Sequence, residues 1–183
     1  FAAHNGNAHT AARYARFLRA AGHRVEVMLT WDSGSADALV ALHARRVHPS
    51  ITAFSGQHPD RPLILVLTGT DLYRDIRDDA QAQESLRLAS RIVVLQARGL
   101  DELPAEVRAK ALTIYQSAPA MRHQPKPVKH FDVCVVAHLR DEKDPFRAAH
   151  ACALLAPTSH IRVRHIGGVL QAGLAQQARQ LEA

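Results

Sequence analysis

The segment from Thr68 to Arg74 carries several residue types that can bind a charged or hydroxylated ligand. It reads Thr-Gly-Thr-Asp-Leu-Tyr-Arg and directly follows the apolar run Leu63–Leu67. Gly69 permits a close backbone approach, Asp71 can orient a sugar hydroxyl or take a proton, and Arg74 can hold a phosphate. The alternative is a capped turn with a surface pair between the arginine and the aspartate.

A second group of polar residues follows a different apolar run. Arg45 and Arg46 come shortly after Ala38–Leu42, and a guanidinium group suits a phosphate because it can donate two parallel hydrogen bonds. His43 stands at the end of the same run, where a histidine acts either as a base or as a structural hydrogen-bond donor. The sequence leaves both roles of His43 open.

Cations also gather after the run Phe131–Ala137. His138, Arg140 and Lys143 follow it, and Asp144-Pro145 predicts the N-cap and first residue of a helix. Two cations beside a helix N-terminus suit a diphosphate, because the helix dipole and the side-chain donors both favour negative charge. The alternative is a solvated loop in which neighbouring acidic residues pair with these cations.

A glycine turn precedes the first predicted helix. Asn5-Gly6-Asn7 stands before His9–Ala21, and such a turn presents backbone N–H groups to an anion. The side chains of Asn7 and Thr10 can add hydrogen-bond donors. The alternative is a helix cap without a ligand, because the turn lacks the full glycine pattern of a nucleotide-binding loop.

The elements that position these residues are short apolar runs. Each has the length of a strand and is nearly continuous in hydrophobicity, which is typical of parallel strands buried on both faces. Gln96 closes one run, and Gly167 and Gly168 follow another. The carboxyl ends of parallel strands share one edge, where open α/β sheets bind ligands. The runs are Val25–Leu29, Ala38–His43, Leu63–Leu67, Ile92–Gln96, Leu112–Tyr115, Phe131–Ala137 and Ile161–Ile166.

Helical patterns separate most of these runs, and the alternation predicts an α/β fold with a Rossmann-type parallel sheet. The proline-containing segment 118–130 breaks the alternation and predicts a linker. We therefore expect a Rossmann-like domain over residues 1–117, whose first strand lies outside this sequence, and the beginning of a second, truncated domain over residues 131–183. The predicted helices are His9–Ala21, which stops before Gly22, then Asp79–Ser90, Leu100–Ala111, Asp144–Leu155 and Leu170–Leu181.

The composition favours a globular protein and excludes some classes. The 183 residues are 47% hydrophobic and 22% charged, and no apolar run is long enough to span a bilayer, so we expect no membrane partner. The net charge is +6 and arginine outnumbers lysine, but the cations are scattered, and a nucleic-acid partner is weakly supported. The arginine excess has a second explanation in the codon usage of a GC-rich genome.

The cysteines and most histidines suggest no metal chemistry. Cys134 and Cys152 match no metal-binding or redox spacing, and we interpret them as two buried thiols in a reducing cytoplasm. We interpret His48 as a surface residue and Trp31 as a packing residue. No histidine pair stands at zinc spacing within a predicted helix, so we expect no metal.

Several of these motifs in combination resemble one enzyme family, the SenB-like selenosugar synthases of selenoneine biosynthesis. That family is a group of GT-B type glycosyltransferases, in which two Rossmann-like domains face a cleft. The resemblance covers nearly the whole chain. The matching motifs are Gly6-Asn7, Gly22-His23-Arg24-Val25, Ala41-Leu42-His43-Ala44-Arg45-Arg46, Leu67-Thr68-Gly69-Thr70-Asp71-Leu72-Tyr73-Arg74, Val94-Leu95-Gln96, Ile114-Tyr115-Gln116-Ser117-Ala118, Ala137-His138-Leu139-Arg140, Lys143-Asp144-Pro145 and His165-Ile166-Gly167-Gly168.

The resemblance implies an enzyme that forms a carbon–selenium bond without a cofactor. A UDP-sugar, typically UDP-N-acetylglucosamine, gives its glycosyl group to selenophosphate to yield a selenosugar. Arg140 and Lys143 would stabilise the leaving UDP. In the wider retaining GT-B enzymes an arginine stands five residues before the lysine, whereas here that position is His138.

The expected catalytic residues are His43 and Asp71, which position the acceptor. Two alternatives to this enzyme remain at the level of sequence. One is a GT-B glycosyltransferase with an ordinary hydroxyl or thiol acceptor, and the other is a non-catalytic module that binds anions or nucleic acid. The expected substrate-binding residues are Gly6, Asn7, Thr10, Arg45, Thr68, Gly69, Thr70, Arg74, Gln96, His138, Arg140, Lys143, Gly167 and Gly168.

Overall fold

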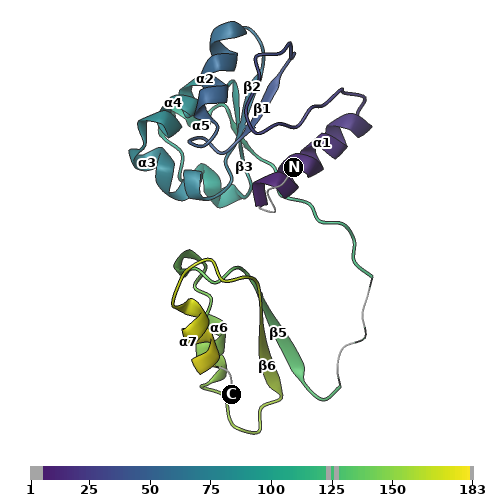
Figure 1. Ribbon diagram of the computed structural model, residues 1–183, viewed down its shortest axis with the longest axis vertical. Helices are drawn as coiled ribbons and strands as arrows, with labels where there is room; N and C mark the ends of the chain where they lie inside the picture. Colours follow the sequence, from purple (N-terminus) through teal and green to yellow (C-terminus); the bar gives the residue numbers. More distant parts are fainter. Residues whose placement is uncertain (1–5, 123–124, 126–127, 182–183) are drawn as a thin grey trace. The chain divides into compact units, whose positions relative to one another are not determined.

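The computed structural model describes residues 6–122, 125 and 128–181 and divides the chain into two compact units (Figure 1). Unit 1 spans Phe1–Pro119 and unit 2 spans Ala120–Ala183. Each unit contains its own parallel sheet. No helix among the described residues is long and apolar enough to cross a membrane.

Unit 1 is built on a parallel sheet of four strands in the order β1-β2-β3-β4. Each neighbouring pair is parallel, so the four carboxyl ends meet at one edge. This sheet confirms the predicted α/β architecture, and each strand falls within one residue of a predicted apolar run. The strands are β1 (Leu39–Leu42), β2 (Leu63–Val66), β3 (Arg91–Val94) and β4 (Ala111–Thr113).

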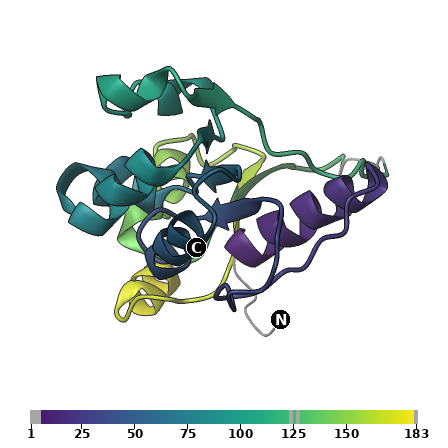
Figure 2. The same ribbon diagram turned by 90° about the horizontal axis from the view of Figure 1, so that it is seen from above.

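Helices cover the sheet of unit 1 and complete its core. Figures 1 and 2 show α2, α3 and α4 gathered on one side, with α1 (Gly6–Ala20) on the other. Ile51 and Phe54 of α2 are fully buried against the same core as Leu65 and Ile92 of the central strands. Burial of these large apolar side chains is the main force that holds the helices to the sheet. The remaining helices are α2 (His48–Gln57), the π-helix η1 (Asp71–Asp75), α3 (Ile76–Asp78), α4 (Ala80–Leu88), the 3₁₀ helix η2 (Ala97–Leu100) and α5 (Ala105–Arg108).

The first helix begins earlier than predicted. Gly6 and Asn7 lie inside its first turn, so the glycine turn predicted there is wrong at these two residues, and Asn5 lies outside the described residues. The helix ends as expected, because Gly22 takes a left-handed φ of +92° that favours glycine.

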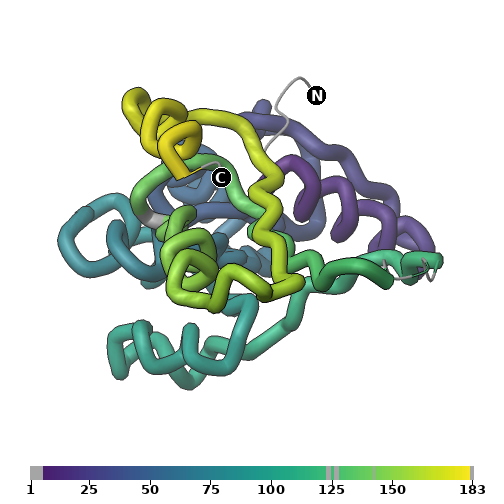
Figure 3. The backbone as a smooth tube through the Cα atoms, turned by 90° about the horizontal axis from the view of Figure 1, so that it is seen from below, coloured from purple at the N-terminus to yellow at the C-terminus, as the bar shows by residue number. Residues whose placement is uncertain are grey.

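The predicted strand Val25–Leu29 does not form. Residues 21–38 instead run back beside α1 toward β1 without regular secondary structure (Figure 3). A strand needs a partner for its backbone hydrogen bonds, but the backbone oxygen of Val25 accepts a hydrogen bond from the side chain of Arg19 (2.5 Å). At the far end of this segment Trp31 is buried, as predicted, with its ring 5.2 Å from that of Phe54.

Two further helices differ from the prediction, while α4 agrees with it. The sequence analysis did not predict α2, in which Pro49 stands at the first turn. The predicted helix Leu100–Ala111 is divided into η2 and the short α5, because Pro104 stands between them in an extended conformation. Asp79 caps α4 as expected and accepts a hydrogen bond from the backbone N–H of Ala82 (2.9 Å).

Unit 2 contains a pair of parallel strands, β5 (Phe131–Val136) and β6 (Ile161–Ile166). The helix predicted to begin at Asp144 begins at Arg147 instead. Asp144 has a left-handed φ of +45° and its carboxylate accepts from the Arg147 side chain, so it does not cap the helix. The helical elements are η3 (Asp141–Lys143), α6 (Arg147–Cys152) and α7 (Leu174–Gln180).

The cysteines differ from the expected buried pair. Cys134 lies on β5 and is exposed, and Cys152 at the end of α6 is partly exposed. Both are free thiols. Packing of buried thiols therefore does not explain either residue.

Candidate functional site

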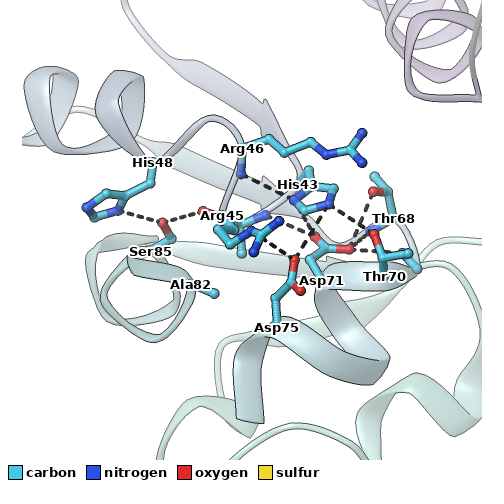
Figure 4. Close-up of polar contacts among 12 residues, drawn as sticks. His43, Arg45, Arg46, His48, Thr68, Thr70, Asp71, Asp75, Ala82 and Ser85 are labelled. Carbon is cyan, nitrogen blue, oxygen red and sulfur yellow. Dashed lines mark hydrogen bonds and ion pairs between the residues drawn. The ribbon is translucent and has the colours of Figure 1, made fainter. Parts of the chain in front are cut away.

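The loops that leave β1 and β2 converge at the carboxyl edge of the sheet in unit 1 (Figure 4). His43 leaves β1 and is only 2% exposed. Its φ of +87° is uncommon for a residue other than glycine, and such conformations concentrate at functional sites. Thr68 and Thr70 follow β2 and face His43.

Asp71 joins the two loops through its carboxylate. One oxygen accepts from the backbone N–H of Ala44 (2.9 Å), and the other accepts from the N–H groups of Thr68 and Gly69 (2.9 Å each). Convergent backbone N–H groups make an anion-binding cradle, and here the protein's own carboxylate occupies it. Asp71 is completely buried. Expected to act on the substrate, it instead holds two loops in place.

A π-helix places two carboxylates around the His43 ring. Asp71 and Asp75 stand at the ends of η1, four residues apart. The Nδ1 atom of His43 lies 4.0 Å from an Asp71 oxygen, and its Nε2 atom lies 3.9 Å from an Asp75 oxygen. Single π-helical turns occur frequently at functional sites.

The hydrogen bonds of His43 assign its tautomer. Nδ1 accepts from the backbone N–H of Arg46 (3.3 Å), and Nε2 lies 3.1 Å from the hydroxyl oxygen of Thr70. Burial lowers the pKa of His43, with Asp71 opposing part of that effect, so the ring is neutral. A neutral ring that accepts at Nδ1 carries its proton on Nε2 and donates it to Thr70.

Three arginines stand at the outer side of this network. The Nε atom of Arg45 lies 3.4 Å from one Asp75 oxygen, and the Nε atom of Arg74 lies 3.0 Å from the other. Both guanidinium groups remain substantially exposed, while the Asp75 side chain is buried. Arg46 is exposed and points away from Asp71 and Asp75 (Figure 4).

Behind the loop that leaves β1, His48 and Ser85 form a buried support that the sequence analysis did not identify. The Ser85 hydroxyl donates to the backbone oxygen of Ala44 (2.7 Å), and its oxygen lies 3.0 Å from Nδ1 of His48. The interpretation of His48 as a surface residue is therefore wrong, since it is 92% buried at the start of α2. Its neighbour Pro49 is the one sequence signal for a helix start here.

The start of α1 also lies at this edge of unit 1. The hydroxyl of Thr10 donates to the backbone oxygen of Gly6 (3.0 Å) and accepts from the Gln116 side chain (3.1 Å). Gln116 follows β4, so these residues share the carboxyl edge with the other loops. Thr10 is buried and uses its hydroxyl internally, while Gly6 is exposed and Asn7 is partly exposed.

Two more predicted residues of unit 1 have internal roles. Gly69 has a φ of +137°, and a Cβ at this position would meet no atom within 4 Å, so the backbone conformation requires the glycine. Gln96, which follows β3, donates to the Tyr73 hydroxyl of η1. The structure thus brings His43, Arg45, Thr68, Thr70, Asp71 and Arg74 into one network, with Gln96 beside it.

In unit 2 the predicted residues gather where β5 and β6 end. The backbone N–H of Gly168 donates to Nδ1 of His138 (3.0 Å). A Cβ on Gly167 would lie 1.9 Å from the backbone oxygen of Ala137, so only glycine allows the two strand ends to approach. The glycines thus serve the close approach of two backbone segments.

The expected diphosphate residues have different surroundings. Lys143 is exposed on η3, and Arg140 is partly buried with an Nε atom that lacks a hydrogen-bond partner among the described residues. The six-residue α6 begins at Arg147, four residues beyond Lys143, so the predicted contribution of a helix N-terminus at Asp144 is absent.

Across the described part of the chain, no group of three or more His, Cys, Asp or Glu side chains is placed to hold a metal ion. The comparisons with known proteins add no relative, since no protein-family model and no curated protein matches the chain. The observed architecture is an α/β fold with a parallel four-stranded sheet, which is compatible with a Rossmann-like domain.

Proposed function

We propose that the protein is a GT-B type glycosyltransferase that moves a sugar from a UDP-sugar to selenophosphate. The observation that carries the proposal is the carboxyl edge of unit 1, where the Asp71 carboxylate fixes two loops and the exposed heads of Arg45 and Arg74 stand beside them. Arginine at fixed loops suits a small oxyanion, which costs too much energy to bind without convergent donors. The motif resemblance supplies the identity of that oxyanion.

The proposed reaction needs no base to activate the acceptor. Selenium in selenophosphate attacks the anomeric carbon, the C1–Se bond forms, and the C1–O bond breaks so that UDP leaves with the electron pair. Water then cleaves the P–Se bond, which releases inorganic phosphate and leaves a selenol on the sugar. Selenium is already a strong nucleophile in this anion. The Asp71 carboxylate accepts from backbone N–H groups, and the Asp75 carboxylate is buried beside Arg45 and Arg74, so neither is exposed to the acceptor, which fits an acceptor without a proton to remove.

Unit 2 is proposed to bind the UDP-sugar, with UDP-N-acetylglucosamine as the donor. Arg140 and Lys143 would stabilise the charge that develops on the leaving diphosphate. The glycines at 167 and 168 allow the backbone to lie close at the strand ends, where nucleotide-binding sheets place their ligands.

A UDP-release assay tests the proposal. The chain is incubated with UDP-N-acetylglucosamine or UDP-glucose, with and without selenophosphate, and the selenosugar is identified by mass spectrometry. We expect UDP release only with selenophosphate, and no loss of it with EDTA because the proposed mechanism uses no metal. Lys143→Ala should lower turnover by about one to three powers of ten. Lys129→Ala is the control, because Lys129 is exposed and has no proposed role, and it should leave turnover unchanged. UDP release that is equal without selenophosphate, or that requires a sugar or thiol acceptor, would refute the proposed acceptor.

A further inference from the structure

Thr70 is half-buried at the carboxyl edge of unit 1, and its hydroxyl group faces the imidazole of His43. Its oxygen lies 3.1 Å from Nε2 of His43. Among the described residues, this ring nitrogen is the one hydrogen-bond partner of the hydroxyl. A threonine hydroxyl both accepts and donates, so the partner of its proton identifies what the site can bind.

The direction of this hydrogen bond follows from the other side of the ring. The backbone N–H of Arg46 points at Nδ1 of His43, which must therefore carry a lone pair and no proton. The proton of the neutral ring is then on Nε2, where Thr70 lies within hydrogen-bond distance and Asp75 lies farther away at 3.9 Å. His43 donates to Thr70, and the Thr70 proton is directed away from the ring.

Both carboxylates near the His43 ring, Asp71 and Asp75, are buried and are not exposed to a ligand. Asp71 uses both oxygens for the backbone N–H groups of Ala44, Thr68 and Gly69. The other carboxylate near the ring, Asp75, is buried beside the Arg45 and Arg74 side chains. Its Oδ2 atom lies 3.9 Å from Nε2 of His43 and has no hydrogen-bond partner among the described residues. The groups left to contact a ligand are the Thr70 hydroxyl and the arginine heads, and all of them donate hydrogen bonds.

We infer that Thr70 is a ligand-binding donor positioned by His43, and that His43 holds this hydroxyl in direction and does not remove a proton from the acceptor. The site then selects a ligand that is already an anion with unshared electron pairs, and it disfavours a neutral alcohol that must lose a proton. This inference deepens the proposed function, since it concerns the acceptor half of the same site and the same substrate class.

Binding of inorganic phosphate to the whole chain tests the donor role. Affinity is measured by calorimetry at pH 8 for the unchanged protein, Thr70→Ser, Thr70→Val and Thr52→Val, with thermal melting to confirm that each variant folds. Thr52 is the matched control because it lies on α2 and gives its hydroxyl to the helix backbone. We expect Thr70→Val to bind about tenfold more weakly, which is the loss of one charge-assisted hydrogen bond. Thr70→Ser and Thr52→Val should stay within about twofold of the unchanged protein.

A second measurement tests the role of His43. Sulfate keeps its charge between pH 6 and pH 8, so its affinity reports the protein alone. The charged groups that face His43 are Asp71, Asp75, Arg45 and Arg46. The contribution of His43 to sulfate binding is the ratio of the sulfate affinities of the unchanged protein and His43→Gln. We expect this ratio to be constant from pH 8 to pH 6.

Four results would overturn the inference. They are unchanged phosphate affinity in Thr70→Val, an equal loss in Thr70→Ser, a His43 contribution that grows severalfold as the pH falls to 6, and no phosphate binding by the unchanged protein. Failure of the proposed function gives a different result, in which the Thr70 series behaves as expected but selenophosphate does not trigger UDP release.

Discussion

At the scale of single residues, the position of a polar side chain after a strand does not tell whether it faces a ligand or the backbone. The sequence places Asp71 and Arg74 at the same strand exit, and both are suited to substrates. In the structure Asp71 turns inward to three backbone N–H groups, whereas Arg74 keeps an exposed head. Only the local backbone path decides this, and the π-helical turn that sets it has no recognisable sequence pattern.

The inward position of Asp71 predicts a structural cost for its removal. In Asp71→Asn, one acceptor oxygen becomes an NH₂ group that faces backbone donors, so buried N–H groups lose their partner. We expect the free energy of unfolding to fall by about 2–4 kcal/mol, since hydrogen bonds to charged groups are among the stronger ones. Urea unfolding followed by the fluorescence of Trp31, the one tryptophan of the chain, measures it in unit 1. The control Asp101→Asn alters an exposed carboxylate and should cost less than about 0.5 kcal/mol. Equal stability of the two variants would contradict the assigned role.

The buried His43 predicts a pH dependence of stability. Burial lowers its pKa below the ordinary 6.5, so the unfolded chain takes up the proton first as the pH falls. The stabilising contribution is therefore present above about pH 6.5 and is lost as the pH falls from there toward the lowered pKa. His43→Gln cannot titrate, and its urea midpoint should decline less between pH 7 and pH 5 than that of the unchanged protein. If the urea midpoints of the two proteins decline equally, another histidine causes the loss of stability at low pH.

At the scale of elements, hydrophobic runs predicted strands well where a partner strand was available. β1 to β6 all lie in predicted runs or begin one residue before them, because parallel strands are apolar on both faces. Val25–Leu29 is also mostly apolar but forms no strand, since an apolar sequence alone does not supply a hydrogen-bonding neighbour. Helix α2 was missed because serine, threonine and glycine residues interrupt its apolar pattern. Its buried residues Ile51 and Phe54 belong to the core, but only the structure shows this.

Because the ends of β5 and β6 lie close together, we expect alanine to be destabilising at one of two adjacent glycines and tolerated at the other. A Cβ on Gly167 would lie 1.9 Å from a backbone oxygen, whereas the nearest atom to a Cβ on Gly168 is Nδ1 of His138 at 3.5 Å. Gly167→Ala should therefore destabilise unit 2 by about 1–3 kcal/mol or more, while Gly168→Ala should be tolerated. Amide hydrogen exchange of β5 and β6 measures this, and equal exchange in the two variants would contradict it.

At the scale of the whole molecule, the chain forms two units with separate sheets, and the described residues between β4 and β5 have no regular secondary structure. The sequence predicted a linker here from its prolines, which interrupt the alternation of strands and helices. Binding residues were proposed in both units from the sequence.

This organisation predicts where trypsin cuts first. Arg122 is exposed in the segment between the units, and Arg24 is exposed in the irregular segment after α1. A protease needs several residues of extended chain, so both sites should be cut before Arg91, which is held in β3. Mass spectrometry of early digestion products should show a fragment that ends at Arg122, and Arg122→Gln should remove that fragment. Cleavage at Arg91 before Arg122 would contradict the folded sheet of unit 1.

The shared Asp71 carboxylate has a consequence for how the carboxyl edge opens. The N–H groups of Ala44, Thr68 and Gly69 come from two loops but depend on the same side chain. Neither loop can leave its place without stranding a buried charge that the other loop alone would have to satisfy. The two loops therefore form one cooperative foldon, whose three amides gain access to solvent in a single event with a common opening free energy.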